Sequence, residues 1–206
     1  MGKLIVVISL AVLLIPGIAG ANLLVNPGFE SLVVENGQMQ GWKNAWNANI
    51  FSMADNPHSG AMAARNFWDG GVYQNVEITA GVQYRLTGWA YIPSGEGGSL
   101  WGSFVKLSWL DKDGYLVVPY VDGWQAVVER LPRDRYNLID SGYLTSPGNA
   151  VLAGVSFGTW SDFPNLPVRP TDFDDFDFSP IPEPASLLLL GTGLFGLFAV
   201  RKRVIK

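Results

Sequence analysis

Few residues in this sequence could perform catalysis. The single histidine, His58, lies in the turn-like segment Asn56-Pro57-His58-Ser59-Gly60 without a nucleophile elbow nearby, so a Ser-His-Asp triad is not indicated. With no cysteine and one histidine, clustered zinc ligands are excluded. Residues 22–180 hold seventeen acidic side chains, yet no spacing singles out the carboxylate pair that glycoside hydrolysis uses. We therefore expect no enzyme, and a glycosidase or polysaccharide lyase is the less favoured alternative.

The net charge of the central region limits its partners. Residues 22–180 contain nine lysines and arginines against seventeen aspartates and glutamates, which gives a net charge near −8. The whole chain carries −4, because a basic C-terminus offsets part of this acidity. Such a surface repels polyanions, so nucleic acid is not an expected partner.

The elements that must position any site are predicted to be β-strands. Gly, Pro, Asn and Asp interrupt the central region about every eight to twelve residues, and no segment keeps apolar residues at helical spacing for three turns. Predicted strands cover residues 23–25, 61–67, 72–78, 83–92, 103–110, 115–119, 125–130, 150–158 and 172–178. They predict an all-β fold, an antiparallel two-sheet β-sandwich in one domain over residues 22–179. At this size the core is large enough to fold without disulfides.

A series of short motifs favours the jelly-roll form of this sandwich. The motifs are Asn26-Pro27-Gly28-Phe29-Glu30, Gly41-Trp42, Ser59-Gly60-Ala61, Tyr73-Gln74, residues 81–89 and Phe173-Asp174-Asp175-Phe176. In order and spacing they resemble the galactose-binding-like jelly roll of many carbohydrate-binding modules. The resemblance spans nearly all of residues 22–179.

The resemblance implies a structural calcium ion that ties the first strand to the last. Calcium needs several oxygen ligands, including carboxylates from distant parts of the chain. Asp174 lies on an otherwise apolar strand face, where a carboxylate needs a partner. We expect Glu30, Asp174 and carbonyl groups near Ser59 and Gly60 to share the ion. The alternative is that the aspartates of residues 172–177 form a solvated edge that discourages strand aggregation.

The resemblance also implies sugar binding through exposed aromatic rings. Eight tryptophans are more than a core of this size requires, although Trp89 and Trp109 fall in predicted strands and are assigned to packing. Five candidates for ligand contact stand in predicted loops or at strand ends: Trp46, Trp68, Trp101, Trp124 and Trp160. For each of them, packing is the alternative. The acidity of the domain favours a neutral polysaccharide as ligand.

The N-terminus has the pattern of a secretory signal peptide. Lys3 precedes an apolar run over residues 4–15, a Pro16-Gly17 helix breaker, and Ala19 and Ala21 at cleavage-site spacing. This pattern predicts a signal-peptide helix over residues 1–21. An N-terminal membrane anchor would need a longer apolar run.

The C-terminus combines three features in a fixed order. Pro182, Glu183 and Pro184 form an extended tripeptide, because each proline opposes helix formation before it. An uncharged run over residues 185–200 then predicts a transmembrane helix of about 24 Å, short for a hydrocarbon core of about 30 Å. The basic tail over residues 201–206, with its stop signal Arg201, Lys202 and Arg203, would stay on the cytoplasmic side.

This order of features, over residues 180–206, resembles the PEP-CTERM sorting signal of Gram-negative bacteria. The resemblance implies that exosortase, a membrane-embedded transpeptidase-like cysteine protease, recognises the tripeptide, and that the helix anchors the chain only transiently in the inner membrane. An ordinary tail anchor is the alternative.

Together these patterns predict a protein carried across the inner membrane by the secretion machinery and then sorted to the outer surface or extracellular matrix. Its domain is expected to be a non-catalytic module that binds polysaccharide. A purely structural or adhesive surface protein on the same fold, without affinity for glycans, is the alternative.

Overall fold

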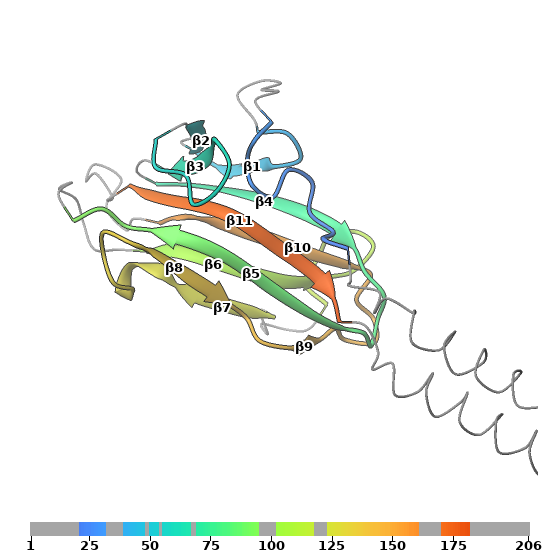
Figure 1. The fold of residues 1–206 in the computed structure, drawn as a ribbon. Helices are drawn as coiled ribbons and strands as arrows, with labels where there is room; N and C mark the ends of the chain where they lie inside the picture. Colours follow the sequence, from blue (N-terminus) through green and yellow to red (C-terminus); the bar gives the residue numbers. More distant parts are fainter. Residues whose placement is uncertain are drawn as a thin grey trace, which may run out of the picture. The chain divides into compact units, whose positions relative to one another are not determined.

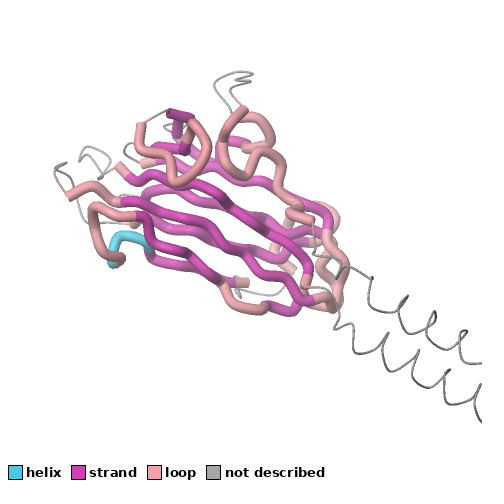
Figure 2. Tube along the Cα trace, viewed as in Figure 1, coloured by secondary structure: helices cyan, strands magenta, loops and turns pink. Residues whose placement is uncertain are grey.

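The computed structural model describes residues 21–31, 39–47, 50–53, 55–66, 69–94, 102–117, 123–160 and 170–181. Asn22–Pro180 forms a compact unit of strands, with one short 3₁₀ turn, η2 (Val128–Arg130), as its helical element among the described residues (Figures 1 and 2). The helices predicted at the two ends of the chain, and the tripeptide 182–184, lie outside the described residues. Within those residues no helix is long and apolar enough to span a bilayer.

Two antiparallel sheets form the sandwich, which confirms the predicted all-β fold (Figure 1). The five-stranded sheet has the order β1 (Lys43–Trp46), β4 (Gly70–Glu77), β10 (Leu152–Thr159), β6 (Ser103–Leu110) and β7 (Trp124–Val127). The six-stranded sheet has the order β2 (Ile50–Met53), β3 (Ala63–Asn66), β11 (Thr171–Pro180), β5 (Gln83–Tyr91) and β8 (Tyr136–Asp140), with β9 (Leu144–Thr145) also paired to β5.

The core lies between the sheets and is rich in aromatic rings. Strand alternation turns Leu86 and Ala90 of β5 and Leu107 of β6 inward, as the sequence predicts. Phe157 of β10 packs at ring-centroid distances of 4.7 Å from Phe173 and 5.0 Å from Trp42. A fully buried side chain of this size stabilises a fold by about 1.5–3 kcal/mol, so such a cluster explains how the sandwich stands without disulfides.

Three predicted strands differ from the structure. The predicted strand 125–130 ends at Val127, and its last three residues form η2. Residues 23–25 are not a strand: Leu23 N donates to Phe178 O, but the next two backbone N–H groups donate to the side chains of Asn22 and Gln74. In the predicted strand 115–119, Leu116 makes a single bridge with Leu110. Conversely, β1, β2, β8 and β9 were not predicted, because these short strands lie at or near the sheet edges and alternate too briefly to give a pattern.

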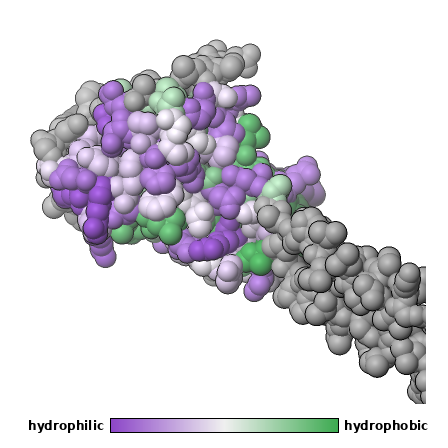
Figure 3. All heavy atoms as spheres, viewed as in Figure 1, coloured by the Kyte–Doolittle hydropathy of each residue, from purple (hydrophilic) through white to green (hydrophobic). Residues whose placement is uncertain are grey.

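The outer faces of the two sheets differ in surface character. The face formed by β11, β5 and β8, turned to the viewer in Figures 1 and 3, is predominantly hydrophilic with scattered apolar spots. The opposite outer face, on the five-stranded sheet, carries a hollow. The candidate site is therefore on the five-stranded sheet.

Candidate functional site

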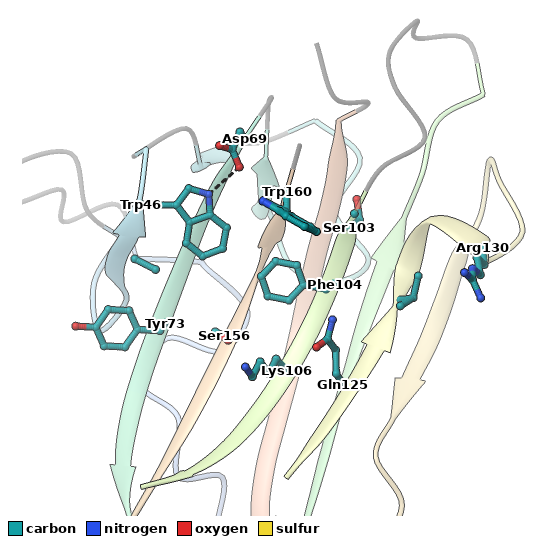
Figure 4. A pocket seen from close by; sticks show the side chains of 13 residues that line it. Trp46, Asp69, Tyr73, Ser103, Phe104, Lys106, Gln125, Arg130, Ser156 and Trp160 are labelled. Atoms are coloured by element: carbon teal, nitrogen blue, oxygen red, sulfur yellow. Dashed lines mark hydrogen bonds between the residues drawn. The ribbon is translucent and has the colours of Figure 1, made fainter. Parts of the chain in front are cut away.

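An open hollow of ≈ 850 Å³ lies on the outer face of the five-stranded sheet (Figure 4). Every strand of the sheet contributes to its lining, together with Asp69, Gly102, Arg130 and Trp160. The cross-strand register groups the side chains into two parallel rows. We call them the aromatic row (Trp46, Gly71, Gly158, Phe104, Val127) and the polar row (Lys43, Tyr73, Ser156, Lys106, Gln125).

The aromatic row places two rings over two glycines. The rings of Trp46 and Phe104 are nearly parallel, 10° apart, with centroids separated by 5.9 Å. A Cβ atom on Gly71 would lie 2.3 Å from the indole of Trp46, and one on Gly158 would lie 2.3 Å from the carbonyl oxygen of Gly70. Glycine at 71 thus leaves room for the indole of Trp46 against the sheet, whereas glycine at 158 is required by the close approach of the β4 backbone.

Hydrogen bonds fix the tryptophans that border the hollow. Trp46 Nε1 donates to Asp69 Oδ1 at 2.8 Å, and Asn47 Nδ2 donates to the second oxygen of the same carboxylate at 3.1 Å. Trp160 follows β10, and its backbone N donates to Gly102 O at 3.0 Å. Trp160 remains 53% exposed, so its ring can contact a ligand at the rim of the hollow.

The polar row lies beside these rings and supplies hydrogen-bonding groups. Because side chains alternate along a strand, Tyr73, Lys106 and Gln125 project from the same face as Trp46 and Phe104. Rows two residues apart along a strand are separated by about 6.6 Å. A sugar ring stacked on the aromatic pair therefore has hydroxyl, amide and ammonium groups within reach of its edge.

The five predicted tryptophan contacts have different outcomes. Trp46 and Trp160 line the hollow. Trp124, at the start of β7, is half-buried and packs against the core. Trp68 and Trp101 lie outside the described residues. Of the two tryptophans assigned to packing, Trp109 is buried as predicted.

Sequence reasoning missed Tyr73, Phe104, Lys106 and Gln125. A signal for Phe104 and Lys106 was present, since the alternation that buries Val105 turns its two neighbours outward. An outward aromatic residue in the middle of a regular strand marks a candidate contact. The predicted contacts were tryptophans in loops or at strand ends, so Phe104 was not among them.

The four residues predicted to hold calcium lie around one segment, residues 58–62. Glu30 Oε1 accepts hydrogen bonds from the backbone N of residue 61 at 2.9 Å and of residue 62 at 3.1 Å. Asp174 Oδ2 accepts from His58 N at 2.8 Å and Ser59 N at 3.2 Å. Both carboxylates, from opposite ends of the domain, thus fasten the segment that includes Gly60.

These acids do not form the solvated edge considered as an alternative. Asp172 and Asp174 are fully buried, and Asp172 pairs with Arg65 at 2.8 Å. Burial raises the pKa of Asp174 to about 6, although hydrogen bonds from backbone N–H groups act in the opposite direction. A buried carboxylate that accepts hydrogen bonds from backbone N–H groups, as Asp174 does, is a chemically suitable ligand for a hard cation. Among the described residues, however, no three His, Asp or Glu side chains are arranged to hold a metal ion, so calcium remains a prediction.

The same segment covers Trp89 of β5. The ring of His58 stacks on this indole at a centroid distance of 4.1 Å, and its Nδ1 lies 2.7 Å from Asp175 Oδ2. Trp89 is consequently half-buried on the outer face of the six-stranded sheet. Its assignment to packing holds, but the packing is against this segment and not in the core.

Comparison with known proteins adds two findings. Residues 180–203 match the PEP-CTERM protein-sorting motif, which confirms the resemblance at the C-terminus and indicates export with C-terminal sorting to the cell surface. No curated protein sequence matches the chain.

Solved carbohydrate-binding modules share the fold. A xylan-binding domain of family 22 has a TM-score of 0.54 at 14% identity, over 79% of this chain and 97% of that one. The family 22 xylan-binding domain of Paenibacillus barcinonensis Xyn10C has a TM-score of 0.52 at 14% identity, over 80% and 97%. TmCBM61 in complex with β-1,4-galactotriose has a TM-score of 0.50 at 21% identity, over 78% and 99%. The predicted jelly-roll sandwich of carbohydrate-binding modules is thereby confirmed.

Proposed function

We propose that residues 22–180 form a non-catalytic polysaccharide-binding module of an exported surface protein. The observation that carries this proposal is the pair of nearly parallel rings, Trp46 and Phe104, on the floor of an open hollow of ≈ 850 Å³. That size lies within the usual range for ligand sites, about 300–1,000 Å³. Structures of the same fold include domains described as xylan-binding and one described in complex with a galactotriose.

The site is suited to recognising sugars. The C–H face of a pyranose can stack on an exposed ring, while its hydroxyl groups bond to Tyr73, Ser156 and Gln125 of the polar row. Because Asp69 already fixes the indole of Trp46, little side-chain entropy is lost when a ligand binds. Such preorganisation favours a binding role.

The presence of one carboxylate among the described lining residues favours binding over hydrolysis. Asp69 is the one carboxylate among the described lining residues, and hydrogen bonds from Trp46 and Asn47 engage its two oxygens. Glycoside hydrolysis typically uses two carboxyl groups that flank the scissile bond, about 5–10 Å apart. The lining therefore does not supply the usual pair.

The sorting motif supports the place of this module in the cell. We infer that exosortase recognises the tripeptide 182–184, that the apolar run 185–200 anchors the chain transiently in the inner membrane, and that the processed protein then reaches the outer surface or matrix. A neighbouring exosortase gene in the genome would support this route.

A binding experiment tests the proposed function. The purified unit Asn22–Pro180, which has its own core, would be run through native gels containing individual polysaccharides, including xylan and galactan. Trp46→Ala should lower affinity at least about tenfold, since a buried aromatic contact typically contributes more than 1.4 kcal/mol to binding. Trp89→Ala, on the other sheet, is the matched control and should bind as the parent does.

Three results would contradict the proposal. If the folded parent domain binds no polysaccharide, a structural or adhesive role is the better description. If Trp89→Ala reduces binding as much as Trp46→Ala, the hollow is not the site. Release of reducing sugars by the parent domain would instead identify an enzyme.

A further inference from the structure

Exposed apolar side chains gather at one end of the sandwich. Eight large apolar side chains are exposed among the described residues, and four of them, each 42% to 73% exposed, lie at this end. We call these four the end cluster: Tyr115, Leu116, Tyr143 and Val151. Two of the other four, Val127 and Trp160, line the hollow. The proposed polysaccharide site does not account for the end cluster.

Strand pairing places Tyr143 beside the last residue of the last strand. Pro180, at the end of β11, pairs with Tyr84 near the start of β5. Leu144, which directly follows Tyr143, pairs with the same residue of β5. The guanidinium of Arg85 lies 5.6 Å from the centre of the Tyr143 ring. Tyr143 is therefore at the end of the sandwich where β11 finishes.

The other three members lie at the same end, on the five-stranded sheet. Leu116 forms a bridge with Leu110, the last residue of β6, and Tyr115 precedes it in the turn. Val151 N donates to the carbonyl oxygen of Leu110 at 3.0 Å, and Val151 O accepts from Ile78 N at 3.0 Å. Residues 78–82 connect β4 to β5, so β4 and β11 end where β5 begins (Figure 1).

The length of chain after β11 limits how far this end can stand from a bilayer. Four residues, 181–184, separate Pro180 from the apolar run 185–200 that is inferred to anchor the chain. From Pro180 to Ala185 an extended chain reaches at most about 18 Å. The headgroup layer takes up roughly 5–8 Å of this reach, and the apolar run is itself about 6 Å shorter than the hydrocarbon core. The anchor thus holds this end of the sandwich close to the lipid.

We propose that the end cluster rests on the lipid surface of the inner membrane while the chain is anchored. Tyrosine suits the interfacial layer, because its ring is apolar and its hydroxyl group is polar. Leu116 and Val151 supply apolar surface that water leaves when the cluster meets lipid. This inference goes beyond polysaccharide binding and rests on the inferred anchoring by residues 185–200.

The charges at this end favour zwitterionic over anionic lipid. Lys112 pairs with Asp113 at 2.8 Å, and Arg85 pairs with Asp140 at 2.6 Å. The carboxylate of Asp111 accepts hydrogen bonds from the backbone N of residues 113 and 115. Residues 22–180 carry a net charge near −8, which repels an anionic surface. The contact is therefore expected to depend on apolar surface and not on charge.

This orientation keeps the hollow clear of the bilayer. Gly71 and Phe104 of the aromatic row lie at the starts of β4 and β6, whereas the end cluster lies beyond the ends of these strands. Gly71 and Glu77 are separated by about 20 Å along β4. The proposed polysaccharide site thus stays accessible while the domain is anchored.

Nitroxide labelling of the full chain tests the contact, and the absence of cysteine from the sequence makes each label unique. Leu116→Cys or Val151→Cys would carry the label, and Leu138→Cys, an exposed position within β8, is the matched control. In vesicles of phosphatidylcholine and phosphatidylethanolamine, labels at 116 and 151 should be more accessible to oxygen, which concentrates in lipid, than to a water-soluble nickel complex. The label at 138 should keep the accessibility that it has in the isolated unit Asn22–Pro180.

Substitution within the end cluster locates the effect. With the label at Val151→Cys, Leu116→Ser should lower the ratio of docked to free domain about tenfold, because the leucine no longer contributes apolar surface. Nickel access at 151 should then rise toward its value in the isolated unit. Val127→Ser removes an exposed apolar side chain from the opposite end and should have no effect. Since both wild-type side chains are exposed, both variants are expected to fold.

Contrary results have distinct meanings. High nickel access at 116 and 151 in a chain that stays in the vesicles overturns the contact. Protection that persists in detergent with spin–spin broadening identifies a second copy as the occupant, and protection that requires added exosortase identifies that enzyme, so either result replaces lipid. If alkaline carbonate extracts the chain, the inference falls together with the anchoring, whereas polysaccharide binding by the hollow is unaffected.

Discussion

Two glycines of the aromatic row have different roles: Gly71 leaves room for the indole of Trp46, and Gly158 leaves room for the backbone of β4. A methyl group on Gly71 would stand 2.3 Å from the indole of Trp46, so Gly71→Ala should displace this ring and weaken polysaccharide binding about tenfold or more. A methyl group on Gly158 would meet the backbone of Gly70, which cannot yield as a side chain can. Gly158→Ala should therefore mainly lower the free energy of unfolding, by about 1–3 kcal/mol.

Binding titrations and urea denaturation on the same samples separate the two effects. Gly148→Ala is the control, because a Cβ atom there has open space around it and the substitution should change neither quantity. Unchanged affinity in a folded Gly71→Ala domain would show that the position of the indole does not matter for binding.

The strands were predicted where alternation is long, and the site was missed where contacts depend on register. In β5 and β6 the pattern identified both the strand and its buried face, because Leu86, Val105 and Leu107 repeat with period two. No local pattern shows that Trp46 lies opposite Gly71, since this pairing is set by tertiary packing across a bulged edge. For the same reason the sequence did not predict the polar row, since its members come from five different strands.

The segment at residues 58–62 joins the beginning of the domain to its last strand, and calcium at Glu30 and Asp174 would strengthen that connection. Without calcium, Asp174 titrates near 3.8 when unfolded and near 6 when folded. The folded state then holds a proton that the unfolded state has lost, so the free energy of unfolding should fall as pH rises from about 4 to 6, by at most about 3 kcal/mol. Bound calcium requires the carboxylate and should reverse this slope.

Thermal unfolding between pH 4 and 7, in chelator and in calcium, measures both effects. At a concentration of about 100 times its dissociation constant, calcium should raise the free energy of unfolding by about 2.7 kcal/mol. Asp174→Asn should flatten the slope in chelator, and Glu30→Gln, which keeps an acceptor for the backbone of residues 61 and 62, should remove the response to calcium. If metal-free protein, verified by elemental analysis, melts identically with and without calcium, the backbone N–H groups alone hold these carboxylates.

For the whole molecule, the signal-peptide pattern and the sorting motif together predict removal of both ends of the chain. If signal peptidase and exosortase process the chain as proposed, mass spectrometry of the protein from its native host should find an N-terminus at Asn22 and no peptide from residues 185–206. Glu183→Ala should hold the precursor in the inner membrane, whereas Glu96→Ala, within the domain region, should be processed normally. A mature chain that retains Arg201 to Lys206 would show a permanent anchor.

The position of β11 has a consequence for the order in which the protein can fold. This strand is the last in the domain, yet it lies in the interior of the six-stranded sheet, between β3 and β5. A chain synthesised from its N-terminus leaves that sheet in two separate pieces until residues 171–180 are available. The tripeptide of the sorting motif begins at Pro182, two residues after β11 ends, so the last strand of the sheet and the tripeptide become available almost together. The six-stranded sheet can thus be completed only when the residues directly before the sorting tripeptide are available.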